Sequence, residues 1–289
     1  MPARDAIDLV ILGALWGAAF LFMRVAAPAF GPVALIAVRV SIAAGLLLPL
    51  MTRDRGLSQA RAALGPLVLV GALNTAIPFT LFAYAALTLP AGLSSVLNAT
   101  VPLSGALVGL AWLGDRPRRL QVAGLALGFG GVLVLAWPRL ASPADWRAVA
   151  AALVATVLYA VSAHLTRQTL GGVRPLVVAG GSMTAAAVML LPLTLVFPPA
   201  ATPSSGAWLA ALALGVASTA IAYVRYFRLI ARSGPTVAMM VTYLVPVFGV
   251  SWGALFLGER LSGTALAGGA LVLAGVGVAT VRPRRQPRA

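Results

Sequence analysis

The sequence predicts an all-α membrane protein with ten transmembrane helices, arranged as two inverted five-helix repeats. Three observations support this fold: the composition is strongly apolar, apolar segments follow one another along the chain, and the second half of the chain repeats the first. Of the 289 residues, 61% are hydrophobic and 9% are charged, which is too little polar surface to cover a soluble globule of this size. The chain has no cysteine, which excludes disulfides and thiolate metal sites.

Ten apolar segments are long enough to cross a bilayer as helices. Their approximate bounds are 6–27, 32–51, 66–88, 91–113, 119–137, 147–169, 174–197, 206–230, 235–257 and 262–281. They do not alternate between apolar and polar residues, so they do not fit a β-barrel. No small-residue cleavage site follows the first segment, and we expect it to be a retained helix rather than a signal peptide. The short connections indicate one integrated membrane domain without a soluble module.

Arginine supplies all 21 basic residues and predicts the orientation. With the amino terminus in the cytoplasm, sixteen arginines lie on the inner side, and only Arg139, Arg147 and Arg260 lie in outer loops. This is a strong positive-inside bias, so we expect both termini to be cytoplasmic. Topology and contact with anionic lipids on the cytoplasmic side then explain the net charge of +15. Because the arginines are divided among many short loops, we expect no nucleic-acid partner.

A shift of 143 or 144 residues superposes the second half of the sequence on the first. The matches are Pro32 with Pro175, Pro49 with Pro192, Gly71 with Gly215, Pro102 with Pro246, Gly109 with Gly253, Gly124 with Gly268, "TAI" at 75–77 with 219–221, and "LGDR" at 113–116 with "LGER" at 257–260. We expect one repeat over residues 1–141 and a second over 142–289. Each holds five spans, an odd number, so the second repeat enters the membrane from the opposite side. Such inverted symmetry is typical of secondary transporters.

Three prolines near mid-span each follow a polar residue by four positions. The pairs are Asn74 with Pro78, Asn98 with Pro102, and Thr242 with Pro246. In a helix, proline leaves the carbonyl four residues earlier without its donor. At membrane depth such a carbonyl must face protein or a water-filled cavity, and the alternative is a kink healed by neighbouring Ser and Thr side chains. Two of the pairs are related by the repeat, so we expect the prolines to be hinges beside a central polar cavity.

Aromatic residues are further candidates for this cavity. Trp16 and Tyr159 lie near the middle of the first and sixth segments and are related by the repeat; Phe79, Tyr223 and Tyr243 lie in the third, eighth and ninth. For each of them, packing in the core or against lipid is the alternative. Aromatic residues that anchor a helix lie at the membrane interfaces, so the mid-span positions favour a cavity that takes amphipathic or aromatic solutes.

Arg39 and His164 are polar residues whose roles the sequence leaves open. Arg39 lies near the middle of the second segment, where a charge costs about 2.5 to 3.5 kcal/mol. It is either a structural brace bonded to backbone carbonyls, which we favour, or the counter-charge of an anionic solute. His164, the only histidine, is a proton site or a polar wall residue. The six acidic residues all lie at or near helix ends, so transport need not be coupled to an ion, and we expect no metal and no cofactor.

The two halves of five segments, Arg39 in the second segment, Pro102, Pro246, and the "LGD" and "LGE" exits at 113–115 and 257–259 resemble the EamA family of the drug/metabolite transporter superfamily. The resemblance covers nearly the whole chain. It implies a bacterial inner-membrane carrier that exports small metabolites, with a cavity lined by the first, third, fourth, sixth, eighth and ninth segments. One branch of this family exports amino acids, including aromatic ones. Ser182 takes the place of Arg39 in the second half, so Arg39 has no symmetrical role.

We therefore expect a secondary transporter, and not an enzyme, that exports small metabolites by alternating access, foremost neutral and aromatic amino acids. The predicted binding residues are Trp16, Asn74, Phe79, Asn98, Tyr159, His164, Tyr223, Thr242 and Tyr243. The alternatives are a nucleotide-sugar or sugar-phosphate carrier of the same superfamily and a passive channel. An intramembrane enzyme is less favoured, because the chain has one histidine, no cysteine and no acid at mid-depth. The expected partners are the solute and the bilayer, and we expect a monomer.

Overall fold

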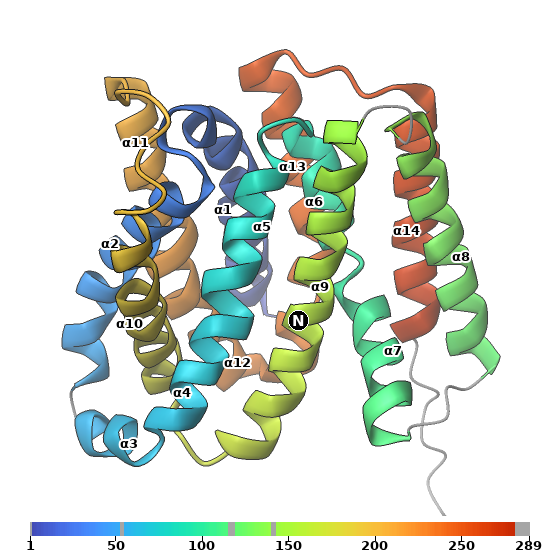
Figure 1. Ribbon diagram of the computed structural model, residues 1–289. Helices are drawn as coiled ribbons and strands as arrows, with labels where there is room; N and C mark the ends of the chain where they lie inside the picture. The colour runs from blue at the N-terminus through green and yellow to red at the C-terminus, as the bar shows by residue number, and fades with distance from the viewer. Residues whose placement is uncertain (1, 53–54, 115–118, 140–142, 281–289) are drawn as a thin grey trace, which may run out of the picture.

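The computed structural model describes residues 2–52, 55–114, 119–139 and 143–280, and within these ranges every regular element is a helix (Figure 1). The first half holds α1 (Ala3–Phe30), α2 (Pro32–Met51), α3 (Gly56–Ala62), α4 (Leu64–Gly71), η1 (Ala72–Ala76), α5 (Ile77–Ala85), α6 (Ala91–Asn98), α7 (Val101–Leu113), α8 (Arg119–Ala136) and η2 (Trp137–Arg139). The second half holds α9 (Pro143–Thr169), α10 (Pro175–Leu193), α11 (Ser205–Gly215), η3 (Val216–Ile221), α12 (Ala222–Ala238), α13 (Val241–Leu257) and α14 (Gly263–Thr280). The predicted all-helical fold is confirmed.

Nine helices of the described chain are long and apolar enough to cross a membrane, and some of them are formed by two or three consecutive elements. The segment predicted at 235–257 differs, because the helix there covers only Val241–Leu257. The preceding helix α12 bends at Gly234, whose φ of 81° and ψ of 166° are not helical, and it ends at Ala238. A tenth span, the inverted orientation of the two halves and the boundary between residues 141 and 142 stay predictions.

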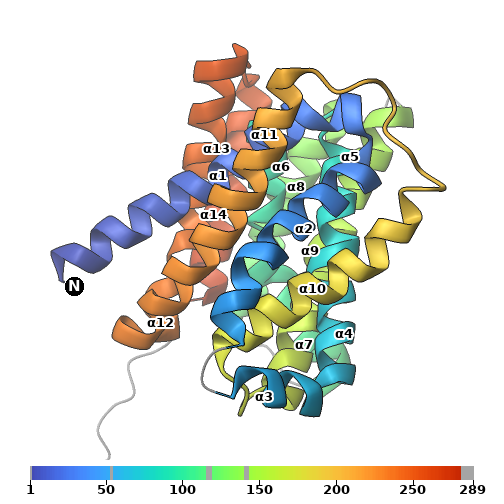
Figure 2. The same cartoon turned by 90° about the vertical axis from the view of Figure 1, so that its left-hand side faces the viewer.

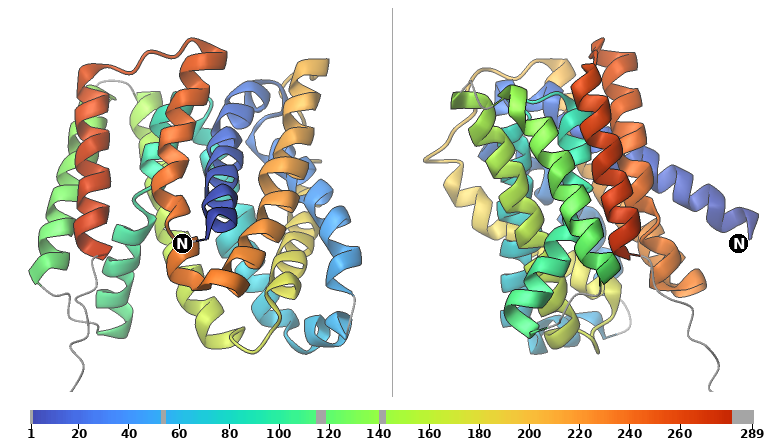
Figure 3. Two further views of the ribbon diagram at one scale, coloured as in Figure 1. Left: turned by 180° about the vertical axis from the view of Figure 1, so that it is seen from behind. Right: turned by 90° about the vertical axis from the view of Figure 1, so that its right-hand side faces the viewer.

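Neighbouring helices in the bundle often come from opposite halves of the chain. Helix α1 packs against α13 and α11, α2 packs against α10, and α5 packs against α9. Helices α8 and α14 lie side by side at one edge of the bundle, and α2 and α10 lie at the opposite edge (Figures 1 and 3). The amino-terminal end of α1 leans away from the other helices (Figure 2). Both halves therefore build the core together.

Glycine lets α8 and α14 approach each other closely. A Cβ atom added to Gly131 would lie 2.6 Å from the backbone nitrogen of Val272, and one added to Gly275 would lie 2.7 Å from the carbonyl oxygen of Gly124. These are backbone neighbours that cannot move aside. These two helices therefore touch through their backbones, which small residues allow in membrane proteins.

Two π-helical turns lie at equivalent places in the halves. η1 interrupts the span formed by α4 and α5, and η3 interrupts the span formed by α11 and α12, with an offset of 144 residues between their first residues. From the sequence, we attributed a backbone defect in the first of these spans to Pro78. The second half forms the same kind of turn with Ala222 at the equivalent position, so the proline alone does not account for it. Turns of this kind are frequent at functional sites.

The other two prolines lie in different local structures. Pro102 lies in the first turn of α7, after a break that separates this helix from α6. Because the backbone N–H of a first-turn residue has no acceptor within its helix, proline loses no hydrogen bond at this position. At the break, the Thr100 hydroxyl donates to the Leu97 carbonyl at 2.8 Å. Pro246 lies inside α13. The three prolines therefore share no common local structure, and their role as hinges stays a prediction.

Candidate functional site

A cavity of about 310 Å³ lies among helices of both halves. Its lining residues are Trp16, Ala19, Phe20, Met23, Arg39, Asn74, Phe79, Phe82, Asn98, Val101, Tyr159, Ala163, Tyr223, Tyr226, Val241, Thr242 and Val245. They belong to α1, α2, η1, α5, α6, α7, α9, α12 and α13. The six segments that the family resemblance implied all contribute, and α2 contributes as well, through Arg39.

The wall of this cavity repeats between the two halves. With the shift of 143 or 144 residues, lining residues form six pairs: Trp16 with Tyr159, Phe20 with Ala163, Phe79 with Tyr223, Phe82 with Tyr226, Asn98 with Thr242, and Val101 with Val245. These pairs make up most of the lining. The cavity therefore lies where the two repeats of the sequence meet, and both repeats contribute equivalent positions to its wall.

Two aromatic clusters form equivalent parts of the wall. Their ring centroids are 6.1 Å apart in Trp16–Tyr223, 5.1 Å in Trp16–Tyr226, 6.4 Å in Phe79–Tyr159 and 6.2 Å in Phe82–Tyr159. In each cluster an aromatic residue of one half packs against two residues of the other. The cluster around Trp16 carries tyrosines where the cluster around Tyr159 carries phenylalanines, so the first cluster has the hydroxyl groups of Tyr223 and Tyr226 and the second has that of Tyr159 itself.

Arg39 breaks the symmetry of the wall, and it is only 5% exposed. Its Nε donates to the Thr219 hydroxyl at 3.0 Å, and its guanidinium carbon lies 3.6 Å from the centroid of the Phe79 ring. Thr219 belongs to the π turn η3 and in turn donates to the Leu214 carbonyl at 2.8 Å. Among the described residues, none accepts a hydrogen bond from the terminal guanidinium nitrogens, and no carboxylate lines the cavity. Arg39 is thus the cationic group of the cavity wall.

The brace to backbone carbonyls that we predicted for Arg39 is made by another residue. Arg24 of α1 donates from Nη1 to the carbonyls of Ala86 and Leu87 at 2.8 and 2.7 Å. These carbonyls follow the end of α5, where a helix leaves its last carbonyls without partners. In the described chain Arg39 is held by a hydroxyl and an aromatic ring instead, so its fork of nitrogens stays available.

Seven of the nine predicted binding residues line the cavity: Trp16, Asn74, Phe79, Asn98, Tyr159, Tyr223 and Thr242. His164 and Tyr243 do not. The His164 Nδ1 lies 2.8 Å from the Ala160 carbonyl oxygen of its own helix, and the Tyr243 hydroxyl lies 2.7 Å from the Thr280 hydroxyl on α14. The cavity gives no support to a contact between these two residues and a solute. The prediction missed Phe20, Met23, Phe82 and Tyr226, which line the cavity as well.

Glu259 joins the two halves at one end of the bundle. Its carboxylate accepts from the backbone N–H groups of Ala91 and Gly92 at 2.8 and 3.3 Å and so caps the amino terminus of α6, a favourable place for a negative charge. This contact joins residues that are 168 positions apart in the sequence. The equivalent Asp115 lies outside the described residues.

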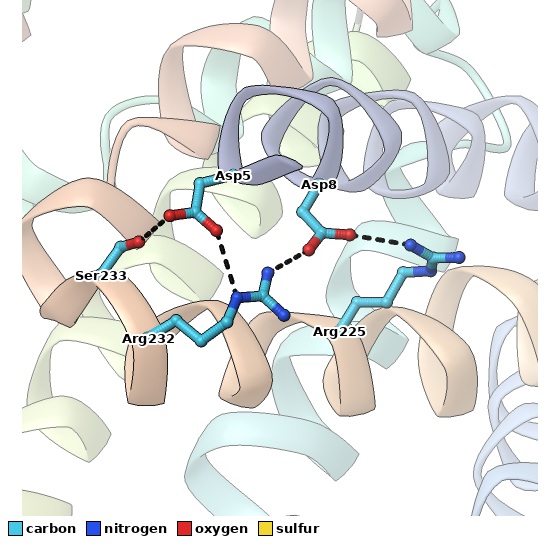
Figure 4. A network of polar contacts seen from close by, with 5 residues as sticks. All are labelled: Asp5, Asp8, Arg225, Arg232 and Ser233. Carbon is cyan, nitrogen blue, oxygen red and sulfur yellow. Dashed lines mark hydrogen bonds and ion pairs between the residues drawn. The ribbon is translucent and has the colours of Figure 1, made fainter. Parts of the chain in front are cut away.

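An ionic network joins α1 to α12 (Figure 4). Asp8 pairs with Arg225 at 2.8 Å and Asp5 pairs with Arg232 at 3.1 Å. Arg232 also contacts Asp8, and the Ser233 hydroxyl donates to Asp5. Both acids are buried. The network ties the amino-terminal end of the first span to α12, again across the two halves.

Comparison with known proteins identifies the family of this chain. Residues 6–137 and 146–281 match the EamA-like transporter family. The chain is 31% identical to the probable terminal-alkyne amino-acid exporter of Streptantibioticus cattleyicolor, over 93% of this chain and 90% of that one. It is 30% identical to the uncharacterized inner membrane transporter YedA of Escherichia coli K12, over 88% and 83% of the two chains.

A solved crystal structure of a protein superposes with a TM-score of 0.69 over 99% of this chain and 100% of its own, at 23% identity. At this identity the likeness shows the fold alone. Two matched family segments together cover most of the chain, and the relatives match it along nearly its whole length. The chain therefore belongs to the EamA-like transporter family and is a membrane transporter.

Proposed function

We propose that this transporter exports amino acids, foremost neutral and aromatic ones, by alternating access of the cavity around Arg39. The observation that carries the proposal is the composition of the cavity wall: two aromatic clusters, the amides of Asn74 and Asn98, and one guanidinium that faces no carboxylate. The Streptantibioticus relative is named as a probable amino-acid exporter, which supports the same substrate class.

Arg39 is the group that would take the carboxylate of the solute. Its Nε is occupied by Thr219, so the terminal nitrogens are free to bind a carboxylate by charge-assisted hydrogen bonds. A carboxylate would also offset the cost of a charge that is buried in the membrane. No acidic side chain of the described wall competes for this position.

The amino group and the side chain of the solute would meet the other parts of the wall. The amide oxygens of Asn74 and Asn98 accept hydrogen bonds, and aromatic faces attract an ammonium group. The clusters around Trp16 and Tyr159 offer ring edges and faces to an apolar or aromatic side chain. A volume of about 310 Å³ is at the lower end of the range for ligand pockets, which favours an amino acid over a nucleotide sugar.

Alternating access would require contacts at the two ends of the bundle to break in turn. Glu259 closes α13 on α6 at one end, and the network of Asp5 and Asp8 closes α1 on α12 at the other. Both sets of contacts join one half of the chain to the other, so they must break when the two halves rock against each other. We place the chain in a bacterial inner membrane with both termini in the cytoplasm, on the basis of its arginine distribution and the inner-membrane description of the relative YedA.

Counterflow in proteoliposomes tests this function. Purified protein is reconstituted into vesicles loaded with one unlabelled amino acid, and uptake of a panel of radiolabelled amino acids, sugar phosphates and nucleotide sugars is followed. We expect saturable uptake of neutral and aromatic amino acids, and no uptake of the corresponding amines that lack a carboxylate. Counterflow of sugar phosphates alone, flux that does not saturate, or a chemically altered product would each contradict the proposal.

A further inference from the structure

A second cleft lies apart from the central cavity, between α1, α2, η3 and α12. Its volume is about 820 Å³. The lining residues are Arg4, Ile7, Asp8, Ile11, Leu46, Leu47, Leu50, Val216, Ala220, Ile221, Val224, Arg225, Arg228 and Arg232. It shares no lining residue with the central cavity. Its walls come from both halves of the chain.

One end of the cleft is strongly basic. Four guanidinium groups and one carboxylate, that of Asp8, line it. Arg225 and Arg232 are engaged by the acids of α1 (Figure 4). Within the described part of the chain, Arg4 and Arg228 make no hydrogen bond and no ion pair, and both are exposed. These two arginines are therefore available to an external anion.

The rest of the cleft is apolar and opens at the surface of the helical bundle. Ile7, Leu46 and Ile221 line it and are 59%, 47% and 45% exposed. The arginines lie toward the ends of α1 and α12, whereas Ile11 and Ile221 lie further into their spans. The cleft therefore has the polarity of a phospholipid, with cations at one end and an apolar groove that continues from them.

We propose that this cleft binds one anionic phospholipid, with its phosphate between Arg4 and Arg228 and an acyl chain along the apolar wall of α1, α2 and α12. Attraction between basic residues at the membrane surface and anionic headgroups is a general source of lipid affinity, and the acyl chain adds burial of apolar surface. The lipid would contact both halves on the side where Asp5 and Asp8 join α1 to α12, so it would stabilise this arrangement of the helices.

Native mass spectrometry of the detergent-purified protein tests the site. The protein is titrated with dioleoyl phosphatidylglycerol, dioleoyl phosphatidylcholine, dihexanoyl phosphatidylglycerol and inorganic phosphate. The same titrations are run on the double variant Arg4→Gln/Arg228→Gln and on Arg61→Gln, an exposed arginine outside the cleft. Thermal unfolding with and without each lipid gives a second measurement, because a ligand that binds the folded state raises the melting temperature.

We expect one long-chain phosphatidylglycerol to bind at least tenfold more tightly than phosphatidylcholine and to raise the melting temperature. The double variant should lose about tenfold of this preference, since each arginine at the surface contributes to anionic-lipid binding, and Arg61→Gln should keep it. Equal binding of the two long-chain lipids overturns the proposal, and so does an equal loss in Arg61→Gln. Equal binding of the short-chain lipid or of inorganic phosphate would overturn it too, because the apolar groove would then have no part in it.

Discussion

Replacement of Arg39 by glutamine removes the charge that we assign to the solute carboxylate. Glutamine retains a polar group near Thr219, whose hydroxyl lies 3.0 Å from the Arg39 Nε, but it has no fork of donors. A hydrogen bond to a charged group contributes about 1.5 to 3 kcal/mol, and about 1.4 kcal/mol corresponds to a factor of ten in affinity. The half-saturation concentration for counterflow of an amino acid should therefore rise about ten- to hundredfold.

Two further variants separate binding from folding. Arg39→Lys keeps the charge without the planar fork and should fall between the wild type and Arg39→Gln. Arg24→Gln removes the guanidinium that donates to the Ala86 and Leu87 carbonyls, away from the cavity lining. It should lower the melting temperature and leave the half-saturation concentration of the folded protein unchanged.

The measurement is initial uptake over a range of amino-acid concentrations, with the amount of folded protein fixed by size-exclusion chromatography before reconstitution. An unchanged half-saturation concentration in Arg39→Gln would refute the assignment of the carboxylate to this residue. An equal rise in Arg24→Gln would also refute it, because the effect would then come from general loss of packing.

Three other variants test the contact of Glu259 with α6, the close packing of α8 against α14, and the aromatic wall of the cavity. Glu259→Gln weakens the cap on α6 by removing a charged acceptor. It should speed maleimide labelling of a single cysteine introduced at Ser95 of α6, which is buried against Gly249 of α13; unchanged labelling would contradict the proposal that the Glu259 contact closes this end of the bundle. Gly131→Ala should lower the melting temperature, since overpacking costs about 1 to 3 kcal/mol. A Cβ at the neighbouring Gly130 meets nothing within 4 Å, so Gly130→Ala should leave the melting temperature unchanged; equal shifts would contradict the backbone contact of Gly131 with α14. Trp16→Leu should raise the half-saturation concentration about two- to tenfold for aromatic amino acids, by loss of about 0.5 to 1.5 kcal/mol of aromatic packing, and less for aliphatic ones; equal effects contradict the aromatic subsite.

The helical fold and much of the cavity could be predicted from the sequence, because both leave local signals. Apolar segments of membrane-spanning length predict helices, and the repeat relates positions such as Trp16 and Tyr159, which do line one cavity. The same shift relates Phe82 to Tyr226. Applied to every aromatic residue, the repeat therefore also predicts this pair as candidates.

His164 and Tyr243 are the two predicted residues outside the cavity lining, and they show that depth in the membrane does not determine which way a side chain points. Thr242 faces the cavity, and Tyr243 follows it directly; adjacent residues of a helix point about 100° apart, so Tyr243 reaches α14 instead. Ala163 lies four residues after Tyr159 and shares its face, whereas His164 lies one position further round. Helical phase, and not only depth in the membrane, decides which residues meet a solute.

Tertiary partners left no local signal in the sequence. The bond from Arg39 to Thr219 spans 180 residues, and the cap of Glu259 on α6 spans 168. Neither follows from the neighbours of these residues along the chain. The π turns were also missed, although the repeated "TAI" marked their positions in both halves. No amino-acid pattern is specific to a π turn, so in the sequence this motif indicates only how the two halves align.

Solute protection of a cysteine in the cavity is the sharpest test of a binding site between the two halves. Ala163 is exposed and lines the cavity, and the chain has no other cysteine, so Ala163→Cys gives a single reporter. Saturating amounts of an amino acid that shows counterflow should slow maleimide labelling of this cysteine, and Arg39→Gln should shift the protection to about ten- to hundredfold higher solute concentrations. Labelling at the same rate with and without the transported solute would contradict a binding site between the two halves.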